Sequence, residues 1–228
     1  MKTLIYQSSL FIHVLCGAVG LTSGFIAMIA RRKGKTVHNI AGTIFYWAML
    51  GVFLTTLSFF ILYPEQMKYQ FFLGIGIISF YPAYAGKRIL SMKKEIVPNL
   101  LDKIAMWLVG ICGVVMWAYA IKLPQSTYQI LFGVFGTVCL QNFIGDWRLY
   151  TGRTKTTSLS WLVGHGGKMT GAFAAATTAF CVNVLPRFLT DYVSQWVIIA
   201  LWILPGLGIG LWGRAMLKKY RIKKEVTK

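Results

Sequence analysis

Seven long apolar runs divide this 228-residue chain, and they constrain its fold more than any other feature. A helix that crosses a bilayer needs about 20 mostly apolar residues. None of the runs alternates with the period of two that is typical of a barrel strand, and hydrocarbon does not tolerate unpaired backbone groups. The sequence therefore predicts an all-α, polytopic bundle of seven transmembrane helices. The runs cover residues 9–30, 40–63, 71–86, 104–120, 130–145, 161–185 and 196–217. The third and fifth are short, so we expect those helices to extend into their flanks.

The charge of the chain is strongly unbalanced, although charged residues are few. There are 24 Lys and Arg residues against 6 Asp and Glu, which gives a formal net charge of +18, yet 56% of the residues are hydrophobic and only 13% are charged. A nucleic-acid-binding domain or a disordered segment would be rich in charge. We therefore expect no nucleic-acid partner and a single membrane domain, residues 1–217, followed by a basic cytoplasmic tail, residues 218–228.

The basic residues gather on one side of the predicted membrane. Segments 31–35, 87–103, 148–155 and 214–228 hold nineteen of them, whereas the opposite ends of the runs hold four and the sixth run holds one. Because loops rich in Lys and Arg stay in the cytoplasm, this pattern predicts an N-terminus outside and a C-terminus in the cytoplasm. Anionic lipid headgroups on the cytoplasmic face are the expected partners of the basic segments, at about 1 kcal/mol per cation near the surface.

Few ionisable groups interrupt the apolar runs, and each is costly enough in a membrane segment to mark a candidate functional site. Lys168 lies within the sixth run, one turn deeper than His165, and His38 precedes the second run. Polar residues also gather at the end of the fifth run. The predicted cytoplasm-facing site comprises His38, Asn39, Gln141, Asn142, Asp146, Arg148, His165 and Lys168.

Four interpretations of this site are open on the sequence alone. The leading one is binding or translocation of a small polar or anionic ligand, as in a transporter, with Lys168 and Arg148 as cations and with Lys168 and His165 as the expected contacts. The second is a b-type haem held by His38 and His165, since two neutral imidazoles at one depth suit haem iron. The third is an enzyme that modifies a lipid or quinone. The fourth is a structural network in which Lys168 reaches the interface.

The third histidine, His13, lies near the outer end of the first run. It shares a helical face with Gly17, Gly20 and Gly24 and is therefore expected to point into the bundle. His13 and His38 are separated by about 37 Å of helix, which argues against a three-histidine metal site. We expect a buried, hydrogen-bonded His13, with a metal or proton site as the alternative. The glycine face favours close helix packing within the chain. It also motivates a further alternative for the function, in which the protein is a non-catalytic partner subunit of a membrane complex.

Three patches carry a resemblance to a known family. They are the His13 helix with its three glycines, the basic turn RRKGKTVHNIAG that contains His38, and the stretch from Trp161 through His165 to Ala172. Together they resemble an uncharacterised family of bacterial multispanning membrane proteins, a domain of unknown function. The resemblance implies a multi-pass protein of the bacterial inner (cytoplasmic) membrane and implies no activity.

Overall fold

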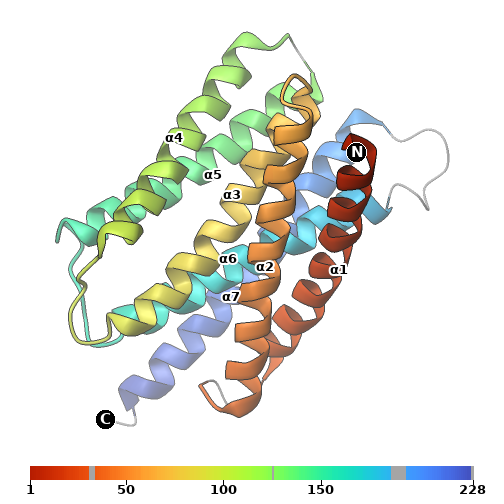
Figure 1. Ribbon diagram of the computed structural model, residues 1–228. Helices are drawn as coiled ribbons and strands as arrows, with labels where there is room; N and C mark the ends of the chain where they lie inside the picture. Colours follow the sequence, from red (N-terminus) through yellow and green to blue (C-terminus); the bar gives the residue numbers. More distant parts are fainter. Residues whose placement is uncertain (31–33, 125, 186–193, 227–228) are drawn as a thin grey trace.

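The computed structural model describes residues 1–30, 34–124, 126–185 and 194–226, and within these ranges the chain is helical, with no strand. Figure 1 shows the helices gathered into one elongated bundle, with the chain starting at one end and α7 running to the other. Five of the cations that carry the orientation argument lie outside the described residues. They are Arg31, Arg32, Lys33, Arg187 and Lys228.

All seven predicted helices are present, and the expected extension of the third and fifth is confirmed at both ends. The seventh helix is longer than predicted, because it continues without a break into the segment expected to be a separate tail. The helices are α1 (Lys2–Ile29), α2 (Thr36–Leu62), α3 (Met67–Arg88), α4 (Leu100–Lys122), α5 (Thr127–Tyr150), α6 (Ser160–Val184) and α7 (Gln195–Val226), with a short 3-10 turn at Ile89–Ser91.

Among the described residues, five helices are long and apolar enough to cross a membrane: α1, α2, α4, α5 and the Gln195–Lys219 part of α7. The other two, α3 and α6, occupy the middle of the bundle. Helix α3 packs against α2, α4, α5 and α6, while α6 packs against α1, α3 and α7. Twelve of the 22 residues of α3 are buried. Helices that face protein on most sides need less apolar sequence than helices that face lipid, which explains why α3 can be more polar than its neighbours.

Helices α4 and α5 form a hairpin at one side of the bundle (Figure 1). They approach so closely that a Cβ placed on Gly113 would lie 3.0 Å from the carbonyl oxygen of Gly136, which explains the glycine at each position. The hairpin joins the rest of the molecule mainly through α3. In the described part of the chain, α5 and α6 do not pack against each other directly, so a crevice separates them over the α3 side.

Candidate functional site

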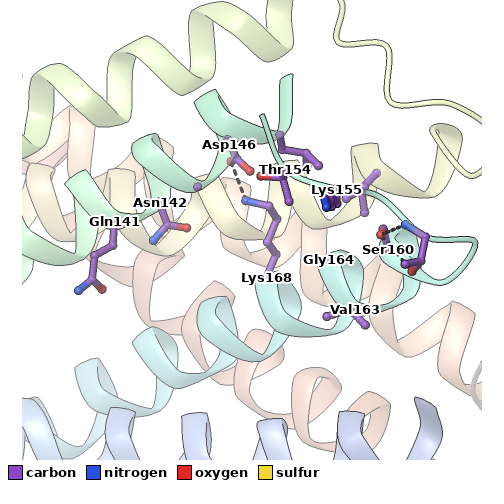
Figure 2. A pocket seen from close by; sticks show the side chains of 13 residues that line it. Gln141, Asn142, Asp146, Thr154, Lys155, Ser160, Val163, Gly164 and Lys168 are labelled. Atoms are coloured by element: carbon purple, nitrogen blue, oxygen red, sulfur yellow. Dashed lines mark hydrogen bonds and ion pairs between the residues drawn. The ribbon is translucent and has the colours of Figure 1, made fainter. Parts of the chain in front are cut away.

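The crevice between α5 and α6 is bridged by an ion pair. The Nζ of Lys168 lies 2.6 Å from Oδ2 of Asp146, and the Asp146 side chain is only 4% exposed. Figure 2 shows the Lys168 side chain extending from α6 to meet the carboxylate on α5. Lys168 thus reaches a buried carboxylate on the neighbouring helix.

A third helix contributes to this pair. The hydroxyl of Tyr81 on α3 donates a hydrogen bond to Oδ2 of Asp146, and the ammonium of Lys168 lies 5.4 Å from the centroid of the Tyr81 ring. Both donors reach the same carboxylate oxygen. Among the described residues, the other oxygen, Oδ1, has no hydrogen-bond partner. Asp146 thus keeps an acceptor available at the edge of the crevice.

The ion pair lines a cavity of about 600 Å³. Small-molecule sites commonly have volumes of about 300–1,000 Å³, so this cavity is large enough for a ligand. Its walls come from the end of α5, the start of α6 and the connection between them. The polar lining residues are Gln141, Asn142, Asp146, Thr154, Lys155, Thr157, Ser160 and Lys168 (Figure 2).

Local sequence explains how these side chains are held. Asn142 precedes Asp146 by four residues and so lies one turn away on the same face of α5. Its amide donates to the carbonyl of Val138 at 2.9 Å, which fixes the side chain against the helix. The start of α6 is held by Ser160, whose hydroxyl accepts from the backbone N–H of Thr157 at 2.7 Å. The cavity therefore has a preorganised polar wall.

The two histidines of the predicted site come together, but outside this cavity. The ring centroids of His38 and His165 are 6.2 Å apart, with the ring planes nearly perpendicular. Nδ1 of His38 lies 3.0 Å from the carbonyl oxygen of Ala27, and Nδ1 of His165 lies 2.7 Å from that of Gly86. Ala27 and Gly86 are in the last turns of α1 and α3. Each histidine thus ties one helix to the end of another.

These surroundings bear on the haem interpretation. Of the two glycines beside His165 that could accommodate a ring, Gly166 is covered, because a Cβ there would lie 2.3 Å from Cδ2 of Leu217, whereas a Cβ on Gly167 would meet no atom within 4 Å. The described residues also contain no group of three or more His, Cys, Asp or Glu side chains arranged to hold a metal. Haem binding by His38 and His165 stays a prediction, and the absorption spectrum of the purified protein checks it.

The remaining predicted residues lie apart from the cavity. Arg148 is exposed and does not line the cavity, although it is on the same helix as Asp146. The amide of Asn39 donates to the carbonyl of Gly34 at 3.2 Å and so closes a turn. His13 is half-buried rather than buried; its Nδ1 lies 2.8 Å from the hydroxyl of Thr55 and its ring packs on that of Phe59, so the expected hydrogen bond is present.

Sequence reasoning missed the contributions of α3 and of the loop before α6. In the sequence alone, Tyr81 is one of many aromatic residues, and Lys155 is one of several cations in a predicted loop. A usable signal exists, because Tyr81, Tyr84 and Arg88 follow the spacing of one helical face. This spacing predicts a polar stripe on an otherwise apolar helix. Comparisons with protein-family models, curated proteins and solved structures gave no match, so function must be inferred from the geometry of the site.

Proposed function

We propose that the protein binds or translocates a small polar or anionic ligand at the cavity between α5 and α6, with Lys168 as the principal contact. The observation that carries this proposal is the Lys168–Asp146 pair, since it combines a buried charge pair with the wall of a 600 Å³ cavity. A pair that served packing alone would not need to border an open space. Lys155 adds a second cation to the lining, so the cavity favours an anion.

Binding would work by exchange of partners around Lys168. An incoming anion would take the ammonium from Asp146, while Tyr81 would continue to donate to the carboxylate. Buried charges are tolerated only when they are paired, so ligand and carboxylate would compete for one cation. Release of the ligand would restore the original pair. While a monoanion is bound, the site would carry one extra negative charge, which Lys155 in the cavity lining would offset, and such a cycle suits reversible binding.

The test uses inorganic phosphate as the probe anion and the unfolding midpoint of the purified protein as the readout. Phosphate should raise the midpoint of the parent more than chloride does at equal ionic strength, because ligands that bind only the folded state stabilise it. The double variant Asp146→Asn with Lys168→Met should lose this increment. Arg148→Gln is the matched control, since its side chain lies outside the cavity. A double variant that still responds to phosphate would remove Lys168 from the site.

For the setting, we propose seven crossings of a bacterial inner membrane, with the N-terminus outside and the C-terminus in the cytoplasm. The distribution of the 24 cations supports this orientation. Reporter fusions test it, using one enzyme active only outside the cytoplasm and one fluorescent only inside. Fusions after Lys122 should give the outside signal and fusions after Lys155 the inside one. The reverse pattern would overturn the orientation.

A further inference from the structure

A second cavity, of about 440 Å³, continues the crevice along α6. Its lining comes from α3, α5, α6 and α7 and is largely apolar. Ile78 and Pro82 of α3 form part of one wall, and Trp202 of α7 forms part of another. Asn142 and Lys168 line both this apolar cavity and the polar one. The two cavities, one polar and one largely apolar, therefore adjoin at Asn142 and Lys168.

The apolar cavity opens to the side of the bundle. Three of its lining residues, Val138 of α5 and Leu207 and Leu211 of α7, are exposed. Along α6, Gly167 and Gly171 border open space, because a Cβ placed on either would meet no atom within 4 Å. Small side chains here keep the groove from being filled by α6 itself. In a membrane, this opening would face the lipid, so a ligand would enter sideways.

Charge defines the polar part of the crevice. Three cations line the two cavities, Lys155, Lys168 and Arg214, against one carboxylate, Asp146. Lys168 and Arg214 are the charged residues in the lining of the second cavity, and its other lining residues are uncharged and mostly apolar. This distribution complements a molecule with an apolar chain and an anionic head. The two cavities, of about 600 and 440 Å³, are each within the range of small-molecule sites and suit a single chain better than a whole two-chain lipid.

We propose that the crevice binds a single-chain anionic amphiphile that enters from the membrane, with its chain in the groove of Gly167 and Gly171 and its head at Lys168. This inference rests on the proposed function, because the head occupies the cavity assigned there to a small anion. To that function it adds an apolar chain on the ligand, entry of the ligand from the side of the bundle, and Arg214 as a further cation. Asn142, at the junction, is positioned beside the link between head and chain.

The experiment compares octyl phosphate with inorganic phosphate and with uncharged 1-octanol, on the full chain in nanodiscs of phosphatidylcholine. Gly171→Leu fills the groove with a side chain where there is now open space. Gly42→Leu is the matched control, since a Cβ there also meets no atom within 4 Å but lies on α2, away from the groove. Ala175→Leu, also in the groove lining, serves if Gly171→Leu does not fold.

We expect Gly171→Leu to weaken octyl phosphate binding about tenfold, the loss that one displaced chain segment produces in an apolar pocket. It should change inorganic phosphate binding less than twofold, and Gly42→Leu should leave both unchanged. The Asp146→Asn, Lys168→Met double variant should bind neither octyl phosphate nor inorganic phosphate. It should bind 1-octanol as the parent does. Replacing the disc lipid with phosphatidylglycerol should leave octyl phosphate binding intact.

The outcomes separate the two proposals. Lys168-dependent phosphate binding combined with octyl phosphate binding that ignores Gly171→Leu would overturn the amphiphile and leave the small-anion site. Octyl phosphate binding that depends on both Lys168 and Gly171, without any phosphate binding, would support the amphiphile and overturn the small-anion site. Competition by phosphatidylglycerol would show that a two-chain lipid occupies the groove and would overturn the single-chain assignment.

Discussion

Two buried aspartates, Asp102 and Asp146, have similar partners and different surroundings. Each pairs with one cation and accepts from one tyrosine of α3, and the two tyrosines, Tyr84 and Tyr81, are three residues apart on that helix. Around Asp102 the pairing is saturated. Arg88 contacts both carboxylate oxygens at 2.8 Å, and the carboxylate also accepts from the backbone N–H of Asn99, which completes a capping box at the start of α4.

Around Asp146 the pairing is incomplete. Lys168 and Tyr81 share one oxygen, and the other faces a cavity. A saturated carboxylate holds helices in place, since every acceptor is used by the protein itself. An unsaturated carboxylate beside open space can exchange a partner. Both sites contain a buried charge. What separates the structural site from the candidate ligand site is the number of hydrogen-bond and ion-pair partners that the carboxylate has.

The largest expected effect is on the stability of the saturated site. Asp102→Ala removes the Arg88 pair, the Tyr84 bond and the capping box at once, so we expect a loss of about 3 kcal/mol in the free energy of unfolding. Denaturant titration in detergent measures it. The adjacent exposed Lys103→Ala is the control and should change the free energy by less than about 0.5 kcal/mol. Equal stability of parent and Asp102→Ala would contradict a structural role.

The second effect is at the Asp146 site and is a coupling. Lys168→Met alone leaves a buried carboxylate without its cation and should cost about 2 kcal/mol, whereas adding Asp146→Asn should restore most of that loss. A double-mutant cycle on unfolding free energies measures the coupling. If the double variant regains stability but does not bind phosphate, the pair serves ligand binding rather than stability. If the double variant is no more stable than Lys168→Met alone, the two side chains are not coupled.

A third comparison removes one hydroxyl from each site. Tyr84→Phe and Tyr81→Phe should each lower the free energy of unfolding by about 1.5 kcal/mol, since each hydroxyl donates to a charged group. Only Tyr81→Phe should also weaken phosphate binding, by a few fold, because Asp146 then depends more on Lys168. Phosphate binding, measured per folded molecule, distinguishes the Tyr81→Phe variant from the Tyr84→Phe variant. Equal binding by both variants would argue against partner exchange.

The smallest effect concerns cations of the α5 end and the loop that follows. Lys155 lines the polar cavity and Arg148 does not. Lys155→Gln should weaken phosphate binding about twofold to threefold, in line with the modest energies of exposed charge pairs, while Arg148→Gln should have no effect. Repeating the titration at high salt should remove the difference, since exposed charges are screened. An Arg148→Gln variant weaker than Lys155→Gln would shift the site toward the end of α5.

The fold was predictable because apolar runs of sufficient length leave the backbone little choice in a membrane. The site was predictable only in part. Lys168 stood out because charges are rare in such runs, and Asp146 was grouped with it among the polar residues at the end of the fifth run, but their contact was not predicted. The spacing of Tyr81, Tyr84 and Arg88 indicates a polar stripe, whereas the contact of Tyr81 with Asp146 and the position of Arg148 depend on how far α5 stands from α6. The distance between α5 and α6 is set by α3, which packs between them, and no sequence pattern in α5 or α6 indicates this distance.

The ion pair also has a consequence for how the chain is made. Asp146 precedes Lys168 by 22 residues, so in the membrane setting proposed above α5 would meet the bilayer before its cation has emerged. An unpaired aspartate in a helix centre opposes insertion by about 2.5–3.5 kcal/mol, and less near the interface. Helix α5 therefore gains a partner for its charge only when α6 follows. Insertion of the two helices becomes a joint event, and a chain that stops before α6 would carry a poorly anchored α5.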